Sequence, residues 1–256
     1  MILVDRHIHS TFSDGANTPE EIVQEAINRQ MTTIGFSDHS YLFFDERFCT
    51  KDYTGYIAEI NRLKEKYRDK IEILLGVEQD YYSKEYPYKF DYKIGSVHFI
   101  KCGNDYLSVD HTPDILMAGV KKHFDGDIYA FCERYYAMVS EIIERTDADI
   151  IGHFDLVSKF NENGELFDSN HPRYVAAYQA AVDKLIEYNK PFEINTGAIS
   201  RGYRVTPYPS VPIKKYIEEK GGSFVLSSDS HQKETICFKF DEFSLKKNPV
   251  PIGTGF

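Results

Sequence analysis

Near its start the chain reads Ile2-Leu3-Val4-Asp5-Arg6-His7-Ile8-His9, a short apolar run that leads directly into two histidines. Residues two apart on an extended segment project to the same face, so His7 and His9 point together. A similar pattern occurs near the other end, where Phe224-Val225-Leu226 precedes Asp229-Ser230-His231. Both ends of the sequence therefore place candidate metal ligands directly after a predicted strand.

The same arrangement recurs between these two segments. Apolar runs precede imidazole or carboxylate side chains at four further places: Thr33-Ile34-Gly35-Phe36 before Asp38-His39, Ile73-Leu74-Leu75 before Glu78, Tyr92-Lys93-Ile94 before His98, and Asp149-Ile150-Ile151 before His153. Active sites of parallel α/β barrels are built at the C-terminal ends of successive strands. The pattern therefore predicts an α/β fold, a distorted (βα)7 barrel, with a metal site at the C-terminal ends of its strands.

The candidate ligands are imidazole nitrogens and carboxylate oxygens, with no thiolate among them. They are His7, His9, Asp14, His39, Glu78, His98, His153, Asp229 and His231. This ligand chemistry suits Zn²⁺, Mn²⁺ or Fe better than a structural cysteine site. Asp14, in Ser13-Asp14-Gly15, is also a common turn residue, so its assignment depends on the surrounding pattern.

Helical and strand patterns alternate along the sequence. Thr18-Pro19-Glu20-Glu21 is typical of a capped helix start. Periodicity predicts helices at about 19–30, 53–67, 128–145, 172–188 and 212–220, and strands at 2–4, 33–36, 71–77, 92–94, 150–153, 192–195 and 223–228. The polar and aromatic stretches 81–91 and 101–127 are expected to be loops that overhang the site. We expect residues 1–256 to form one domain, because such barrels reach about 250 residues.

Composition limits the partners. The net charge of −10 disfavours binding to a polyanion. A small anion remains compatible, because three divalent ions (about +6) outweigh three ligand carboxylates (about −3). The four cysteines form no Cys-x-x-Cys motif, which indicates reduced thiols. The apolar run before Asp5 is too short for a signal peptide or a membrane span, so we expect a cytoplasmic protein that does not bind membranes. The oligomeric state is left open.

Each of the other polar residues near the strand ends can be interpreted in two ways. Four carboxylates could orient the ligand imidazoles or serve turns and ion pairs: Asp5, Asp38, Asp155 and Glu193. Arg201 and Arg204 follow the predicted strand 192–195 and could bind phosphate or lie in a solvated loop. The remaining histidines, His111, His123 and His171, are interpreted as surface residues.

These motifs resemble, in matching order, those of the PHP (polymerase and histidinol phosphatase) family. The segments that carry the resemblance are His7-Ile8-His9-Ser10, Ser13-Asp14-Gly15, Gly35-Phe36-Ser37-Asp38-His39, Gly76-Val77-Glu78, Gly95-Ser96-Val97-His98, Ile151-Gly152-His153-Phe154-Asp155, Glu193-Ile194-Asn195-Thr196 and Ser228-Asp229-Ser230-His231. The resemblance runs from His7 to about Phe240 and is greatest to the monofunctional histidinol-phosphate phosphatases.

The resemblance implies a distorted (βα)7 barrel with three divalent metal ions. One ion would take His7, His9, Glu78 and Asp229, a second would share Glu78 and add His98 and His153, and a third would take Asp14, His39 and His231. Asp14 stands where some relatives carry a histidine. Arg201 falls at a phosphate-binding arginine, and Ser158-Lys159 stands where a second such arginine is expected, so Lys159 would contribute a point charge.

The implied activity is metal-dependent hydrolysis of a phosphomonoester, namely histidinol phosphate in histidine biosynthesis, with Asp14 or a water beside His231 as candidate proton donors. One alternative is a PHP-type phosphodiesterase or 3′–5′ exonuclease, which would need a basic groove. Another is a metal-storage or sensing domain, although open coordination positions are typical of catalysis. Candidate groups in the substrate-facing wall are Tyr81, Tyr82, Asp110 and Asp114.

Overall fold

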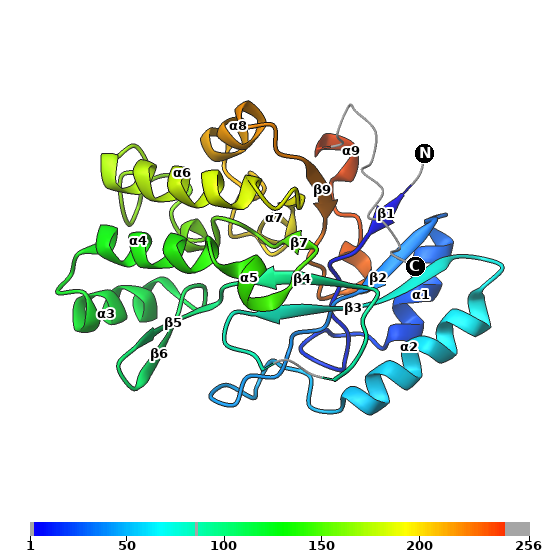
Figure 1. Cartoon of the computed structure of the whole chain (residues 1–256). Helices are drawn as coiled ribbons and strands as arrows, with labels where there is room; N and C mark the ends of the chain where they lie inside the picture. The colour runs from blue at the N-terminus through cyan, green and yellow to red at the C-terminus, as the bar shows by residue number, and fades with distance from the viewer. Residues whose placement is uncertain (1–2, 85–86, 244–256) are drawn as a thin grey trace.

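The computed structural model describes residues 3–84 and 87–243. A parallel sheet of seven strands forms its centre, in the order β1-β2-β3-β4-β7-β8-β9 (Figure 1). The strands are β1 Val4–Asp5, β2 Thr33–Phe36, β3 Glu72–Asp80, β4 Tyr92–Ser96, β7 Ile150–Ile151, β8 Phe192–Asn195 and β9 Phe224–Ser227. Ile2, predicted as part of the first strand, lies outside the described residues.

The sheet curls until its first and last strands meet. Beyond β1 and β9, Ile8 and Ser230 form a parallel bridge. The backbone N–H of His9 donates to the Ser230 carbonyl at 2.8 Å, and the N–H of Ser230 donates to the His7 carbonyl at 3.1 Å. This closure, together with parallel pairing between all neighbouring strands, confirms the predicted distorted (βα)7 barrel. It also brings the two terminal histidine motifs side by side.

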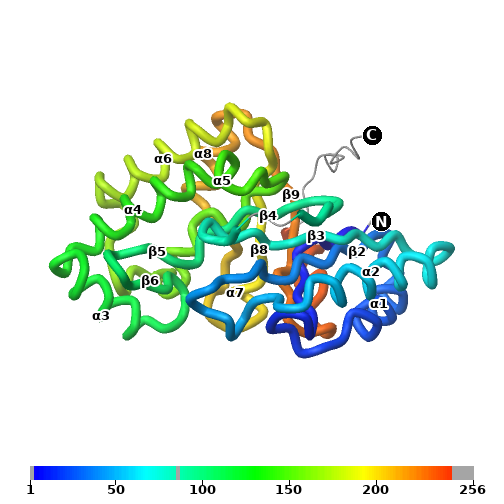
Figure 2. Tube along the Cα trace, turned by 60° about the horizontal axis from the view of Figure 1, so that its bottom comes forward, coloured from blue at the N-terminus to red at the C-terminus, as the bar shows by residue number. Residues whose placement is uncertain are grey.

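Helices surround the sheet on both sides. They are α1 Pro19–Asn28, α2 Tyr53–Tyr67, α3 Pro113–His123, α4 Ile128–Val139, α5 Ile142–Thr146, α6 Pro172–Ile186, α7 Gly197–Ser200, α8 Val211–Glu219 and α9 Phe240–Phe243, with short 3₁₀ turns η1 Leu156–Ser158 and η2 Lys233–Thr235. Helices α1 and α2 lie beside β1–β3, whereas α4, α6 and α8 pack in succession on the other side (Figures 1 and 2). Among the described residues, no helix combines the length and apolar character needed to cross a bilayer.

Local chemistry explains where the first helix begins and ends. The Thr18 hydroxyl accepts from the Glu21 N–H and the Glu21 carboxylate accepts from the Thr18 N–H, a complete capping box. Ile22, Val23 and Ala26 form the buried face. The helix ends before the predicted residue 30, because Gln30 adopts a left-handed φ of 58° that a helix cannot continue through.

The barrel interior is filled at one level by Tyr92. Its hydroxyl donates to the carbonyls of Arg6 (2.5 Å) and Phe36 (3.0 Å), so one side chain from β4 ties together the segments at β1 and β2. A Cβ at Gly76 would lie 2.3 Å from the Tyr92 ring. Glycine is therefore required at this position of β3, two residues before Glu78.

The prediction of a loop over residues 101–127 is wrong. Strands β5 Phe99–Cys102 and β6 Asp105–Ser108 form an antiparallel hairpin, and α3 follows it. The Thr112 hydroxyl accepts from the Ile115 N–H and Pro113 occupies the first turn, which together form a regular helix start. Leu116 and Val120, four residues apart, bury one face of this helix. The aromatic and polar composition concealed this helical spacing.

The predicted helix over 128–145 is divided in two. The Ser140 hydroxyl donates to the Ala137 carbonyl at 2.7 Å, and the Glu141 N–H donates to the Met138 carbonyl. Such local hydrogen bonds compete with the α-helical pattern. The chain therefore turns between α4 and α5, which changes the direction of approach to β7.

Candidate metal centre

Glu78, close to the end of β3, lies at the centre of the site. Its side chain is 1% exposed. One carboxylate oxygen, Oε1, lies 2.8 Å from His153 Nε2 and 3.4 Å from His98 Nε2. The other, Oε2, lies 2.8 Å from His39 Nδ1. Three imidazoles from different strand ends therefore converge on one buried carboxylate.

The two terminal motifs join the same centre. His7 Nε2 lies 3.4 Å and His9 Nε2 3.6 Å from Glu78 Oε2. Asp229 approaches both histidines through Oδ1, at 3.8 Å from His7 Nε2 and 3.3 Å from His9 Nε2. Asp229 has a left-handed φ of 49°, a conformation that is unfavourable for a residue with a side chain and is common at functional sites.

Asp14 gathers the remaining ligands. Its carboxylate lies 3.3 Å from His231 Nε2, 3.8 Å from His39 Nε2 and 3.7 Å from His9 Nδ1. His9 thus borders two groups of ligands, whereas the sequence prediction placed it in one. A Cβ at Gly15 would lie 2.4 Å from the His9 carbonyl oxygen, so only glycine allows this loop to hold Asp14 against His9.

The structure thus brings all nine predicted ligands into one cluster, and the donor set fits divalent cations. Four overlapping groups have ligand atoms within 4.8 Å of one another: His9, Asp14, His39 and His231; His7, His153 and Asp229; His7, His9 and Glu78; and His39, Glu78 and His98. Within the described part of the chain, His7 Nε2 and both ring nitrogens of His9 are buried without a hydrogen-bond partner. Buried polar atoms without partners are costly, and a bound cation would remove that cost.

The protonation of the metal-free cluster reflects its crowding. Burial opposes charge on the imidazoles, but the Glu78 and Asp14 carboxylates outweigh burial and raise the pKa of His39 to about 10. For His9, by contrast, burial and then the neighbouring His231 and His39 lower the pKa to about 3. His39⁺ and the neighbouring imidazolium groups hold the pKa of Glu78 well below its usual range despite burial. Protons therefore occupy positions that cations would take.

Two carboxylates orient ligand imidazoles. Glu193, at β8, accepts a 2.6 Å hydrogen bond from His7 Nδ1, which leaves Nε2 directed at Glu78 and Asp229. Asp80 lies 3.2 Å from His98 Nδ1 through Oδ2. The sequence prediction included Glu193 but omitted Asp80. The signal was present, because Asp80 and Glu78 are two residues apart on one strand and share a face.

The other three predicted orienting carboxylates bind backbone and hydroxyl groups instead. Asp5 accepts from the N–H groups of Ser228 and Cys237, and Asp155 accepts from the Ser210 N–H. Asp38 accepts from the N–H and hydroxyl groups of Ser10 and Ser13. These residues hold the loops that carry the ligands, and the interpretation of them as partners of the imidazoles is wrong.

Arg201 borders the cluster from the turn after α7. Its guanidinium donates to the Asp229 carbonyl at 2.8 Å and to Asp229 Oδ2 at 3.1 Å, and it lies 3.1 Å from His231 Nδ1. The side chain is 30% exposed, so it is accessible from the mouth of the barrel. A guanidinium at this place can contact an anion held by the cluster.

Lys159 and Arg204 are buried near the same rim. The Lys159 ammonium donates to the Asp110 carbonyl at 2.8 Å and to Asp110 Oδ2 at 3.1 Å. The Arg204 guanidinium donates to the backbone and hydroxyl oxygens of Ser158 and Thr206. Arg204 therefore supports the turn that presents Lys159, which is neither of the two roles considered for it from sequence.

Of the four predicted wall residues, Asp110 contacts Lys159 through its side chain, and Tyr82 donates its backbone N–H to Asp80. The Tyr81 hydroxyl donates to Glu141, and the Tyr82 hydroxyl accepts from the Lys101 N–H. Asp114 is exposed in the first turn of α3. His111, His123 and His171 lie outside the ligand groups found among the described residues; His111 is exposed, whereas His123 and His171 are partly buried.

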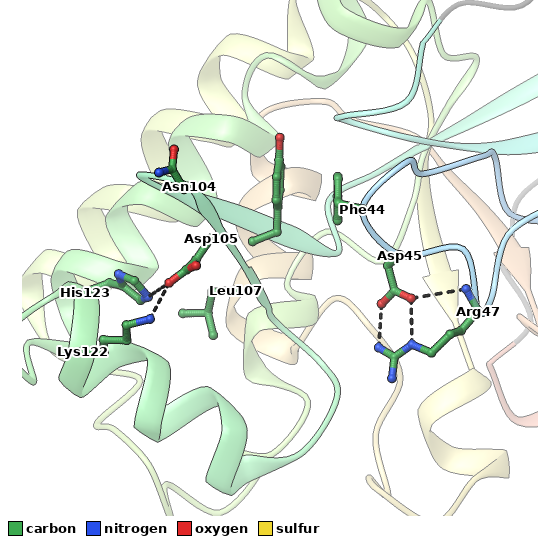
Figure 3. A pocket seen from close by; sticks show the side chains of 9 residues that line it. Phe44, Asp45, Arg47, Asn104, Asp105, Leu107, Lys122 and His123 are labelled. Atoms are coloured by element: carbon green, nitrogen blue, oxygen red, sulfur yellow. Dashed lines mark hydrogen bonds and ion pairs between the residues drawn. The ribbon is translucent and has the colours of Figure 1, made fainter.

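A hollow of about 500 Å³ lies away from the cluster, between the loop after His39 and the β5–β6 hairpin (Figure 3). The rings of Phe44 and Tyr106 stack there at 3.6 Å and connect the two segments. The charged lining residues are paired within the walls: Asp45 with Arg47, and Asp105 with Lys122 and His123. These pairs already balance one another, so the hollow is a weaker candidate for a charged ligand than the metal cluster.

Comparisons with known proteins agree with this geometry. The chain is 29% identical over 255 residues to a proposed histidinol-phosphatase of Deinococcus radiodurans, covering 93% of this chain and 90% of the relative. A solved structure of a proposed histidinol phosphatase from Listeria monocytogenes superposes with a TM-score of 0.81 at 20% identity, covering 94% of this chain and 99% of that one. A Lactococcus lactis histidinol phosphate phosphatase, solved with zinc, L-histidinol and phosphate, superposes with a TM-score of 0.69 at 22% identity, covering 90% of this chain and 87% of that one.

The family model for the PHP domain matches residues 5–197, about three quarters of the sequence. That span begins at β1 and ends at the start of α7, so it includes Glu78 and both of the carboxylates that orient imidazoles. Together with the closed seven-stranded barrel and the histidine-carboxylate cluster at its C-terminal rim, this match establishes that the chain belongs to the PHP family.

Proposed function

We propose that this protein hydrolyses L-histidinol phosphate to L-histidinol and inorganic phosphate in a metal-dependent reaction. The observation that carries the proposal is the convergence of nine imidazole and carboxylate ligands beside Arg201, at the open end of the barrel. Support comes from the sequence relative named for this activity and from the fold shared with a structure that contains L-histidinol and phosphate.

We further propose that three ions are held by the ligand sets expected from sequence, with His9 between the first and third. Divalent ions in these sets would supply Lewis acidity and positive charge for the attack of water on phosphorus. Zinc is present in the Lactococcus lactis structure, and the oxygen and nitrogen donors here are equally suited to Mn²⁺ or Fe.

The chain's own residues position the ester. Arg201 offers a planar guanidinium to phosphoryl oxygens, and Lys159 offers a point charge from the same rim. Hydrolysis breaks the bond between phosphorus and the ester oxygen, and the leaving oxygen must gain a proton. Burial raises the pKa of Asp14, but His39 and His231 outweigh it and keep this carboxyl ionised, which suits a ligand rather than a proton donor. A water beside His231, which lies between Asp14 and Arg201, is the better placed of the two candidates.

The test is a substrate panel with purified protein. We expect kcat/KM for histidinol phosphate to exceed that for nucleotide monophosphates and p-nitrophenyl phosphate by at least about 10²-fold, or about 2.7 kcal/mol. Chelation should abolish the activity, and His7→Ala should lose most of the bound metal. Equal rates across the panel, or stepwise release of nucleotides from a DNA 3′ end, would favour the exonuclease alternative. A metal-loaded protein without hydrolytic activity would favour storage or sensing.

A further inference from the structure

An ion pair between Asp110 and Lys159 borders the metal cluster. Asp110 lies just beyond β6, where the Val109 N–H donates to the carbonyl of the ligand His98 at 2.9 Å. Lys159 directly follows η1, six residues after the ligand His153. The pair is therefore anchored next to both of the histidines that approach Glu78 Oε1.

The surroundings of the Lys159 ammonium are those of a binding site for an organic cation. Besides the two oxygens of Asp110, the ammonium lies 4.7 Å from the ring centroid of Tyr203 and 5.4 Å from that of Phe160. Carboxylate and aromatic faces together stabilise ammonium groups. The Lys159 side chain is 10% exposed and that of Asp110 is 28% exposed, so water can reach only part of the pair.

Asp110 is ionised in this environment. Burial raises its pKa, but Lys159 and, more weakly, His98 outweigh burial and lower the pKa to about 2. The other groups that face it electrostatically are His153, Arg201 and Tyr208. A carboxylate that stays charged at the rim of a cationic centre needs a cation as its partner.

The two charges of the pair are complementary to those of the proposed substrate, which carries an ammonium group a few bonds from an anionic phosphate. The Lys159 ammonium can contact the phosphate, and the Asp110 carboxylate can contact the ammonium group. A phosphate that recruits Lys159 from Asp110 would leave that half-buried carboxylate without a cation and with the Ser108 hydroxyl as a donor at 3.3 Å, which is costly. A substrate with its own ammonium group restores the lost partner, whereas an ester without one does not. The arrangement therefore distinguishes two kinds of ester. It disfavours an ester without an ammonium group through the cost of a carboxylate without a cation, and it attracts an ester that carries one.

We propose that Asp110 is a specificity-determining residue, which binds the ammonium group of an aminoalkyl phosphate when Lys159 transfers to the phosphate. The proposal rests on the proposed function. It assigns the amino end of the substrate to Asp110 and the phosphate end to Lys159 and Arg201.

The experiment compares Asp110→Asn with the wild type on two esters, histidinol phosphate and the same ester without its amino group. Asp69→Asn is the matched control, because it removes the same charge from a side chain that is 91% exposed. We expect Asp110→Asn to lower kcat/KM for the amino ester at least tenfold, as for a hydrogen bond between charged groups. The ester without the amino group should change less than about threefold.

Inhibition by the products separates recognition from folding. Asp110→Asn should raise the inhibition constant of L-histidinol about tenfold and leave that of inorganic phosphate unchanged. An equal loss on both esters, or no loss on either, would overturn the proposal. If Asp110→Asn does not fold, the double variant Asp110→Asn/Lys159→Met removes both charges without leaving either unpaired, and it should still lose the preference for the amino ester.

Failure of the proposed function gives a different result. If the wild type hydrolyses neither ester, that function is refuted, and calorimetric binding of L-histidinol to the wild type and to Asp110→Asn still tests the assignment. Weaker binding by the variant supports the role of Asp110. Equal binding by both proteins overturns it.

Discussion

Glu193→Gln is expected to disable the metal centre although it preserves the shape of the side chain. Glu193 is fully buried and uses both oxygens: Oε1 accepts from His7 Nδ1 at 2.6 Å, and Oε2 accepts from the His153 N–H at 2.9 Å and from Asn195 Nδ2 at 3.1 Å. All three partners are donors, because an ionised carboxylate only accepts. An amide has one acceptor and one donor, so it cannot satisfy all of them.

Each orientation of the new amide has a distinct cost. If its oxygen faces His7, its NH₂ group opposes two donors, and two unsatisfied buried groups cost about 1–3 kcal/mol each. Asn195 cannot turn to compensate without losing its 2.9 Å hydrogen bond from the Gly197 N–H. If the NH₂ group faces His7 instead, Nδ1 must accept, and the ring proton moves to Nε2, the atom directed at Glu78 and Asp229. That tautomer cannot bind a metal.

Both outcomes weaken metal binding, and we expect a loss of about 10–100-fold in affinity, or about 1.4–2.7 kcal/mol. The assay is competition with a chromogenic chelator, together with metal analysis after dialysis. Glu65→Gln, at a side chain that is 81% exposed, is the control. Asp80→Asn should have a smaller effect, because one amide oxygen can still accept from both donors of His98 and only the Tyr82 N–H loses its acceptor. Wild-type affinity in Glu193→Gln would refute the reasoning.

The remaining predictions concern phosphate binding and proton release. Arg201→Ala should lower kcat/KM about 10²-fold, or about 2.7 kcal/mol, while the metal content stays unchanged. Arg201→Lys should recover only part of this loss, because lysine cannot form the bidentate contact of a guanidinium. Wild-type kinetics in Arg201→Ala would show that Arg201 is a solvated loop residue without a role in catalysis. Burial lowers the pKa of His7 and His39, but neighbouring carboxylates outweigh burial and raise both pKa values, that of His39 to about 10. Metal loading at pH 7.5 should therefore release more than one proton per chain. Calorimetry in buffers of different ionisation enthalpy measures this release. Protonation of His39 stabilises the metal-free protein, fully below pH 6.5, and this stabilisation is lost as pH rises through about 10. The apparent metal affinity should therefore increase with pH over this range. Metal loading without proton release would contradict the pKa shifts.

The ligand cluster could be predicted because it depends on one topological rule. Parallel strands place their C-terminal ends at one rim, so an apolar run followed by a histidine or carboxylate fixes both the fold and the location of the side chain. The rule accounts for His39, Glu78 and His153 from three separate strands. It does not specify which atoms approach one another, and the position of His9 between two ligand groups became visible only in the structure.

The supporting carboxylates could not be assigned in the same way. Asp38 and Glu193 are both buried and both lie close to ligand histidines, yet Asp38 holds the loop of Asp14 and Glu193 holds an imidazole. Their difference depends on which donors the neighbouring segments present, and those segments are distant in sequence. The helix α3 was missed for another reason, since its buried face is short and is set within an aromatic, polar stretch.

The strand-end ligands and the groups outside the seven strands have different consequences for substrate choice. The strand-end ligands form a centre that could serve any phosphate ester, because charge at the barrel rim does not distinguish between leaving groups. Discrimination must come from groups that the barrel rule does not place, and Asp110 and Lys159 are of this kind, each held by a segment outside the seven strands. From the roles proposed for Asp110 and Lys159, we expect a change of substrate within this fold to require changes in the β6–α3 and η1 segments, while the nine candidate ligands and Glu193 stay the same.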